Sequence, residues 1–351
     1  MQTVDLFDIE SYNYLLPEEL IAQNPATPRD SSRMLVLDRF SGKMAHRRFF
    51  DLRELLKPSD LLVLNDTRVI PARLRGIKLP GGGKAEVLLL KSLNPEWTEW
   101  EALVKPGRRL RSGTGIMLSD GTVITVGERF EGAEGVRKVF FPQGVPVLSL
   151  LTEIGETPLP PYITRSTAPR SAYQTVFAAR DGSAAAPTAS LHFTEELLEE
   201  LKREIGLSIA WVTLHVGLGT FRPVQCSDIR KHSIHEEYCV LPPETKDLVE
   251  ETKKRGGRVI AAGTTVARTL ESMAAEGGRM RWGEMNTRLF IYPGFEYKAV
   301  DALVTNFHLP KSSLLMLVAA FAGYEPVMRA YETAVSMKYR FFSFGDAMFI
   351  C

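Results

Sequence analysis

The sequence predicts an α/β protein in which a larger α/β domain carries an inserted all-β domain. Three observations lead to this prediction. The chain has 351 residues, enough for roughly two domains at about 150 residues each. Short apolar runs between turn residues fill positions 65–150, and strand-like and helix-like segments alternate from position 151 onward. We expect the insertion to occupy 65–150, and 1–64 together with 151–351 to form the α/β domain.

The first 64 residues contain a helix start and a buried strand. Pro17 precedes Glu18 and Glu19; proline suits the first helical turn, and acids stabilise the positive end of the helix dipole. Positions 61–64 are four consecutive apolar residues, which indicates a buried strand. Because this strand directly precedes the all-β region, an insertion is the simplest architecture.

The predicted all-β region contains five short apolar runs, at 87–90, 102–104, 115–118, 122–126 and 137–141. Glycine- and proline-rich turns separate them, and no helical period is visible. This spacing is typical of a barrel or a sandwich.

The region from 151 onward alternates between helical and strand patterns, which indicates a largely parallel sheet. Thr194 is placed to cap a helix that runs to Ile205. Further helices are expected at 243–255, 265–275, 312–322 and 326–338. Strands are expected at 209–215, 258–262, 289–292 and 302–305.

Composition excludes several classes of protein. The 43 basic and 42 acidic residues give a net charge of +1, so the chain is not a polybasic, histone-like protein. It has no apolar run of about 18 residues and no basic leader, so we expect neither a membrane span nor a secretory signal. The three cysteines, Cys226, Cys239 and Cys351, cannot form a disulfide framework, which favours the cytoplasm.

Polar residues and glycines follow several predicted strands, where ligands bind in α/β sheets. Each group also has an ordinary structural explanation as a capped turn. The groups are Asn65, Asp66, Thr67 and Arg68; His215 with Gly217 and Gly219; Gly263, Thr264 and Thr265; and Asn306, His308 and Lys311. The glycine loop after His215 lacks the third glycine of a dinucleotide fingerprint, and the loop at Gly263 lacks a Walker lysine.

A zinc site is a weaker alternative. Cys226, His232, His235 and Cys239 form the pattern C-x5-H-x2-H-x3-C, which matches none of the usual structural spacings. Glu236 and Glu237 beside this segment could serve as charge partners.

Basic residues cluster in 65–111, where ten Lys or Arg face five Asp or Glu, a net charge of +5. The densest part contains Lys105, Arg108, Arg109 and Arg111. Such a cluster can neutralise phosphates, although a solvated surface is the ordinary alternative. The aromatic run 339–348 could stack a base through Tyr339 or Phe342, or could simply pack on the core.

Seven strings carry a family resemblance: NDTRVIPARL from Asn65, GETPLPPYI from Gly155, YQTVFA from Tyr173, AAPTASLHFT from Ala185, TLHVGLGTFRPV from Thr213, NFHLPKSSLLMLVAAFAG from Asn306 and YRFFSFGDAM from Tyr339. In order and spacing the chain resembles the S-adenosylmethionine:tRNA ribosyltransferase-isomerase family of queuosine biosynthesis. It departs from the family pattern at Ser190, Val266 and Arg288.

The resemblance implies a larger α/β domain with a barrel-like sheet and an inserted small β-barrel. It also implies the reaction. The ribosyl part of S-adenosylmethionine moves onto 7-aminomethyl-7-deazaguanine at the wobble position of a tRNA with a GUN anticodon, giving epoxyqueuosine and releasing adenine and methionine. No prosthetic group and no metal are expected, S-adenosylmethionine being a cosubstrate. A cytoplasmic monomer without membrane partners is expected.

The reaction needs a base for the proton beside the sulfonium and a proton donor or hydrogen bond for departing adenine. On the resemblance, the catalytic candidates are His192, His215, His308 and Asp346. The substrate-binding candidates are Asn65, Asp66, Arg68, Thr188, Gly217, Gly219, Gly263, Thr264, Thr265, Arg268, Asn306, Lys311, Tyr339 and Arg340. Those for the tRNA backbone are Lys105, Arg108, Arg109 and Arg111. The alternatives are a tRNA-binding paralogue without turnover and a zinc-dependent hydrolase.

Overall fold

The structure is a computed structural model that describes residues 4–130, 135–217, 224–275 and 279–351. It divides into two compact units. The larger comprises Met1–Thr67, Pro161–Ala179 and Ala186–Cys351, and the smaller comprises Arg68–Pro160 and Arg180–Ala185. The expected insertion, 65–150, falls mostly within the smaller unit, which also takes in the ten residues after it and a short return strand.

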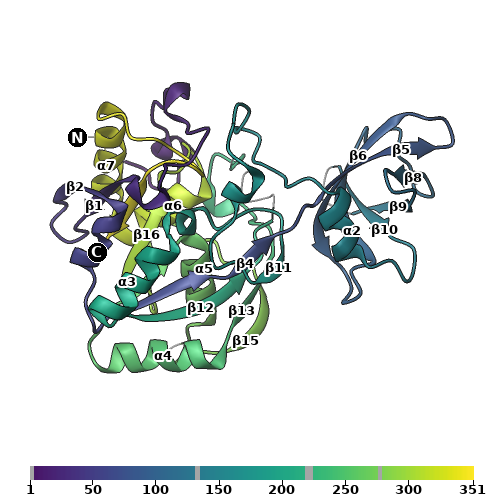
Figure 1. The fold of residues 1–351 in the computed structure, drawn as a ribbon. Helices are drawn as coiled ribbons and strands as arrows, with labels where there is room; N and C mark the ends of the chain where they lie inside the picture. Colours follow the sequence, from purple (N-terminus) through teal and green to yellow (C-terminus); the bar gives the residue numbers. More distant parts are fainter. Residues whose placement is uncertain (1–3, 131–134, 218–223, 276–278) are drawn as a thin grey trace. The chain divides into compact units, whose positions relative to one another are not determined.

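The larger unit is built on a nine-stranded sheet in the order β15-β13-β12-β3-β14-β16-β17-β1-β2 (Figure 1). The strands are β1 Arg33–Leu37, β2 Met44–Arg48, β3 Leu61–Asn65, β12 Ser208–Leu214, β13 Glu237–Leu241, β14 Val259–Ala262, β15 Gly283–Thr287, β16 Ala302–Asn306 and β17 Ala347–Ile350. Every residue of β3, β14, β16 and β17 is buried, which explains their near-continuous apolar sequences.

The prediction of a largely parallel sheet is wrong, because four of its eight strand pairs are antiparallel. Strands β3, β12, β14 and β16 run parallel. Two helices, α6 and α7, lie between β16 and β17, so the chain returns to the edge it left and β17 runs antiparallel to β16. Strand β13 follows β12 without an intervening α-helix in the described residues and is also antiparallel.

The helices are α1 Leu52–Leu55, α2 Val147–Ile154, α3 Glu195–Ile205, α4 Pro243–Lys254, α5 Thr264–Met273, α6 Ser313–Ala322 and α7 Tyr324–Ser336. Thr194 caps α3 as predicted, accepting a hydrogen bond from the Leu197 amide. The apolar face of α3 packs on the central strands through Leu197 and Leu201. No helix in the described part of the chain has both the length and the apolar character needed to cross a bilayer.

The smaller unit is a closed barrel of six antiparallel strands in the order β10-β7-β6-β5-β8-β9. The strands are β5 Arg73–Leu79, β6 Lys84–Ser92, β7 Glu99–Lys105, β8 Gly115–Leu118, β9 Val123–Arg129 and β10 Val136–Phe140. Helix α2 contributes Val147, Leu150 and Leu151 to the barrel core. A short pair, β4 Thr67–Val69 with β11 Arg180–Ser183, completes the strands. The predicted fold class is thereby confirmed.

Three local predictions need correction. The predicted strand at 289–292 is wrong, and the nearby strand is the more polar β15. The expected helix at Pro17 is a single 3-10 turn, η2 Glu18–Leu20. The barrel has one strand more than the five predicted, because β5 contains three basic residues and a glycine and lacks an apolar run.

Candidate active site

The candidate site lies at one edge of the nine-stranded sheet. Strands β3, β12, β14 and β16 all end there because they are parallel, and β1 and β17 begin there because Ala347 pairs with both Asn306 and Met34. A 3-10 helix, η6 Thr188–His192, crosses this edge and presents Thr188 half-buried at its start. Ligands bind beyond the carboxyl ends of such strands.

Ser190 ties η6 to the sheet, since its hydroxyl donates to the Ala262 carbonyl at 3.3 Å. Residue 263 follows with φ +105°, and a Cβ there would lie 3.5 Å from the Ala189 side chain. That φ lies where side-chain-bearing residues are strained, so glycine is required before α5. The family departures are thus accommodated: Ser190 is hydrogen-bonded, and Val266 is buried in the core.

Asn65 joins three elements at this edge. Its Nδ2 donates to the Leu214 carbonyl at 3.0 Å and to Thr265 Oγ1 at 3.2 Å, and its Oδ1 accepts from the Leu214 amide at 3.0 Å. The ends of β3 and β12 and the start of α5 are therefore fixed together by one buried amide. Thr264, the first residue of α5, is buried next to these contacts.

His215 lies just after β12 and is half-buried. Its Nδ1 is 2.7 Å from Thr67 Oγ1, and its ring stacks on Tyr238 at 5.6 Å. Beside it, the Thr213 hydroxyl donates to Asp66 at 2.6 Å. The imidazole thus has a fixed orientation at the sheet edge, as a proton-transfer group requires. Gly219 lies outside the described residues.

Arg268 and Glu237 form a buried ion pair below this edge, with side chains 4% and 3% exposed. Glu237 also accepts from the Gly217 amide at 3.1 Å, and Arg268 Nε donates to the Leu289 carbonyl at 3.1 Å. The charge of Arg268 is therefore balanced within the protein. Its Nη2 is buried and has no hydrogen-bond partner among the described residues.

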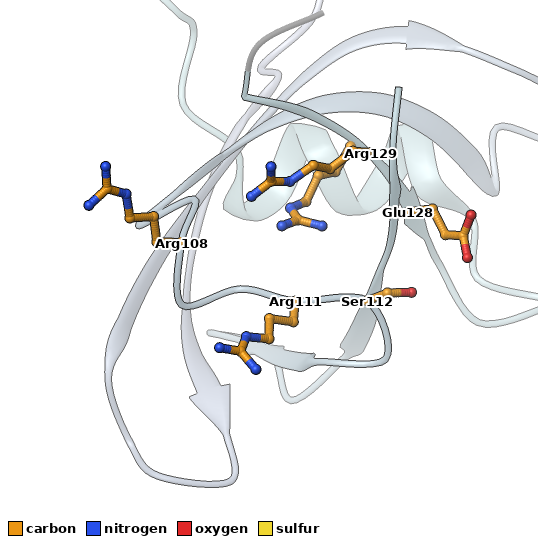
Figure 2. Close-up of a pocket in the computed structure, with 6 residues that line it drawn as sticks. Arg108, Arg111, Ser112, Glu128 and Arg129 are labelled. Carbon is orange, nitrogen blue, oxygen red and sulfur yellow. The ribbon is translucent and has the colours of Figure 1, made fainter. Parts of the chain in front are cut away.

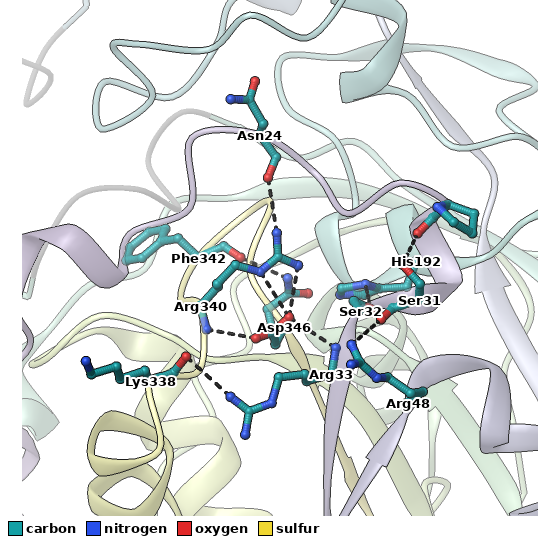
Figure 3. Close-up of polar contacts among 12 residues, drawn as sticks. Asn24, Ser31, Ser32, Arg33, Arg48, His192, Lys338, Arg340, Phe342 and Asp346 are labelled. Atoms are coloured by element: carbon teal, nitrogen blue, oxygen red, sulfur yellow. Dashed lines mark hydrogen bonds and ion pairs between the residues drawn. The ribbon is translucent and has the colours of Figure 1, made fainter.

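A second polar cluster surrounds Asp346, which is 1% exposed (Figure 3). Its carboxylate accepts from the Arg33 amide at 3.1 Å, from the Arg340 amide at 2.8 Å and from the Arg340 guanidinium at 2.9 and 3.2 Å. Arg340 also reaches the Asn24 carbonyl at 3.4 Å. These contacts make Asp346 an anchor for Arg340, since both carboxylate oxygens are occupied.

His192 ends η6 and is buried close to this cluster (Figure 3). Its Nδ1 is 2.8 Å from Ser32 Oγ, and its ring stacks on Phe49 at 4.9 Å. Burial lowers the pKa of His192 to about 4, so the ring is neutral at pH 7. Its Nε2 is buried with no partner among the described residues.

Four other candidates have contacts that favour structural roles. His308 Nε2 is 2.7 Å from Thr305 Oγ1, and burial lowers the pKa of His308 to about 3. Lys311 pairs with Glu10 at 2.7 Å on the surface. The fully buried ring of Tyr339 lies under the Arg33 guanidinium at 3.7 Å. Arg68, in the smaller unit, is 3.9 Å from Asp181.

Asn306 differs from His308 and Lys311 of the same string, because one of its side-chain atoms has no partner among the described residues. Its Nδ2 donates to the Phe342 carbonyl at 2.9 Å, but its buried Oδ1 has no partner among the described residues. A buried polar atom that makes no hydrogen bond within the protein is costly and calls for an explanation, such as a catalytic role or a bound water or ion. Asn306, His192 and Arg268 therefore each leave one such atom near the same sheet edge.

The residues considered for a zinc site make other contacts in the structure. His232 packs edge-on against Phe290 at 5.2 Å, and burial raises the pKa of Cys239, within β13, to about 11. Glu236 and Glu237 serve as charge partners for Arg288 and Arg268. In the described ranges, no group of three or more His, Cys, Asp or Glu side chains is placed to hold a metal ion.

The basic candidates of the smaller unit lie on the connection between β7 and β8. Arg108 and Arg111 line a hollow of about 690 Å³ whose other lining residues are Ser112, Glu128, Arg129 and Arg137 (Figure 2). We call it the arginine hollow. Lys105 and Arg109 are exposed and do not line it.

Sequence reasoning missed several of these residues. Ser32 and Arg33 make contacts across the fold that no local pattern reveals, and the sequence singled out Thr67 without revealing its contact with His215. Arg137 lies within a predicted strand and Arg129 lies beyond the end of the strand predicted at 122–126, so neither arginine has a distinctive spacing. One contact was indicated by the sequence: Glu237, beside the Cys/His segment, was a possible charge partner, and it pairs with Arg268.

An α/β unit with a polar site at its strand ends, joined in one chain to a closed β-barrel, defines a two-domain enzyme architecture. Residues 9–350 match the model of the family described as queuosine biosynthesis protein, and the chain belongs to this family. It is 49% identical over 342 residues to the S-adenosylmethionine:tRNA ribosyltransferase-isomerase of Halothermothrix orenii, covering 97% of this chain and 99% of that protein.

A solved structure agrees. The crystal structure of S-adenosylmethionine tRNA ribosyltransferase from Thermotoga maritima matches with a TM-score of 0.56 and 41% identity, covering 97% of this chain and 100% of that one.

Proposed function

We propose that the chain transfers and isomerises the ribosyl moiety of S-adenosylmethionine onto 7-aminomethyl-7-deazaguanine in tRNA, giving epoxyqueuosine and releasing adenine and methionine. It is a transferase-isomerase of queuosine biosynthesis, with S-adenosylmethionine as cosubstrate. The full-length similarity to the Halothermothrix orenii relative carries this proposal. The unpartnered buried atoms of His192, Arg268 and Asn306 at the sheet edge are the structural feature that fits it.

His215 and His192 are the proposed proton-handling residues. The Thr67 hydroxyl orients His215, and its half-buried position gives access to a ligand beyond the strands. His192 is neutral at pH 7 and has one ring nitrogen available to accept or donate a hydrogen bond. In this scheme Asp346 is a positioning residue that holds Arg340, and His308 supports the fold.

The methionine carboxylate is proposed to meet the start of α5. The backbone N–H groups at Thr264 and Thr265 begin that helix, where the dipole favours an anion. Arg268 adds an unpartnered Nη2 one turn further on. Since its charge is already balanced by Glu237, Arg268 would act as a hydrogen-bond donor more than as a net charge.

The proposed macromolecular partner is a tRNA with a GUN anticodon. Lys105, Arg108, Arg109 and Arg111 are proposed to neutralise its backbone, which predicts binding that weakens with salt. We also propose that the protein is a cytoplasmic monomer.

Adenine release, followed by chromatography, tests the function. The protein is mixed with S-adenosylmethionine and tRNA that carries 7-aminomethyl-7-deazaguanine, with unmodified tRNA as the control. We expect many equivalents of adenine per enzyme with the modified tRNA alone. Tight tRNA binding with no release would instead identify a binding paralogue.

A further inference from the structure

The arginine hollow has an unfavourable charge arrangement. Four arginines and one acid line it, a net charge of +3. Among the described residues Glu128 is the one acidic lining residue, and Figure 2 shows its carboxylate pointing away from the guanidinium groups of Arg111 and Arg129. In the described part of the chain, no ion pair joins Glu128 to these arginines. Within the described residues, the positive charge of the hollow therefore has no ion-pair partner.

The positive charges of Arg129 and Arg137 repel each other. They are register partners on the antiparallel strands β9 and β10, and like charges directly opposite destabilise a sheet. Arg137 is also only 6% exposed. Burial and the neighbouring Arg129 charge hold its pKa below the ordinary arginine value. Its side-chain contacts are two long bonds to carbonyls, with Gly127 at 3.5 Å and Gly107 at 3.4 Å. A buried arginine with no acidic partner is rare in a protein core.

The β7–β8 connection, which lines the hollow through Arg108 and Arg111, is ordered by its own hydrogen bonds and by bonds to Val126 of β9. Leu110 is fully buried in the barrel core, between Arg108 and Arg111 on the β7–β8 connection. The Leu110 and Thr114 amides are bonded at 3.2 and 3.0 Å within the same connection. Because the backbone is already ordered, little entropy is lost when an anion binds.

From these observations we infer that the arginine hollow is a discrete binding site for a backbone phosphodiester of RNA, with Arg129 and Arg137 as its anchors. Planar guanidinium groups match a phosphate through paired hydrogen bonds. The inference rests on the proposed function for the identity of the RNA, and it extends the proposed contacts beyond the exposed connection to two strands of the barrel. A free phosphate would satisfy the same chemistry.

The test uses the full chain and four proteins: wild type, Arg129→Gln, Arg129→Lys and the control Lys138→Gln. Lys138 follows Arg137 on β10, is exposed and does not line the hollow. Adenine release is measured against tRNA concentration, and tRNA affinity is measured against salt. Arg129 is chosen because it is exposed, so the variants retain the core; thermal melts check that they fold.

We expect Arg129→Gln to raise the KM for tRNA about tenfold with unchanged kcat and unchanged KM for S-adenosylmethionine. The slope of log affinity against log salt should fall by about 1. Arg129→Lys should also raise this KM, because lysine keeps the charge but lacks the planar set of N–H donors with which a guanidinium binds a phosphate. If Arg129→Lys matches wild type, or if Lys138→Gln weakens binding as much as Arg129→Gln, the hollow is no more than diffuse positive surface and the inference is overturned.

Inorganic phosphate distinguishes the two sources of the anion. If phosphate binds wild type and fails to bind Arg129→Gln while the KM for tRNA is the same in both, the site takes free anions and the RNA assignment is wrong. Failure of the proposed function gives a different result: wild type would release no adenine, yet tRNA binding would still depend on Arg129.

Discussion

The sheet-edge site and the arginine hollow treat charge in opposite ways. At the sheet edge, Arg268 is paired with Glu237 and Arg340 with Asp346, so each arginine has its own buried carboxylate. In the hollow, Arg129 and Arg137 face each other with no acidic partner in the described residues. An arginine can therefore either organise a site or recruit a ligand. The paired ones hold other groups in place, whereas Arg129 and Arg137, with no acidic partner among the described residues, are available to an anion from outside.

The largest effect on stability is expected from breaking the ion pair of Arg268 and Glu237 at the sheet edge. Glu237→Ala leaves Arg268 buried without its partner, which should lower the free energy of unfolding by about 3–5 kcal/mol. Denaturant unfolding measures this change. The matched control is Glu200→Ala, because Glu200 pairs with Arg53 on the surface at 3.5 Å and should cost about 0–1 kcal/mol. Equal effects of the two variants would contradict the distinction between organising and surface pairs.

A pH series tests the buried histidine of the sheet edge. The pKa of His192 is about 4 in the folded chain, against 6.5 for an unperturbed histidine. The unfolded chain therefore binds the proton first as the pH falls, and stability drops between pH 6.5 and about 4. The loss attributable to His192 should reach roughly 3 kcal/mol.

His192→Gln should flatten this slope of stability against pH. It should do so only in part, because burial depresses the pKa of His308 in the same direction. A slope unchanged by the substitution would show that His192 is more solvated than its contacts indicate.

A smaller effect is expected from the hydroxyl that orients His215. Thr67→Val keeps the shape of the side chain and removes the 2.7 Å contact to Nδ1. Turnover of adenine release should fall about tenfold, equivalent to about 1.4 kcal/mol. Thr333→Val, which removes an exposed hydroxyl from α7, should keep full turnover. Wild-type turnover in Thr67→Val would mean that His215 needs no such orientation.

The smallest effect has the opposite sign. Arg129→Gln should stabilise the free protein by about 0.2–1 kcal/mol, because it removes like-charge repulsion across β9 and β10. Thermal melts in low salt measure this gain, which salt should diminish. Destabilisation would mean that the arginines of the hollow are already compensated, and the contrast with the sheet edge would disappear.

The sequence predicted best the elements that depend on local patterns. Buried strands such as β3, β14 and β16 and the capped helix α3 followed from apolar runs and a threonine cap. Edge strand β15 and barrel strand β5 were missed, because their residues are polar or basic and their strand state comes from pairing with neighbours. Tertiary context overrides weak local preference in such strands.

The candidate site shows the same division. The strings around Asn65, His215 and Asn306 pointed to the correct sheet edge, because strand ends can be located from sequence. The partners could not be predicted. Ser32 reaches His192 across 160 positions, and Glu237 reaches Arg268 across 31. Such pairs are set by the fold and leave no spacing in the chain.

The order of the sheet has a consequence for synthesis of the chain. Strand β1 enters the sheet through β17, about 300 positions later in the sequence. At about 5–20 residues per second, the hairpin of β1 and β2 waits on the order of 15 to 60 s on the ribosome before its partner strand exists. During that time the apolar edge of β1, which β17 will cover, is open to other strands. The basic residues His46, Arg47 and Arg48 lie on β2, the other strand of the hairpin, which stays at the edge of the finished sheet, where charged side chains discourage pairing with another chain.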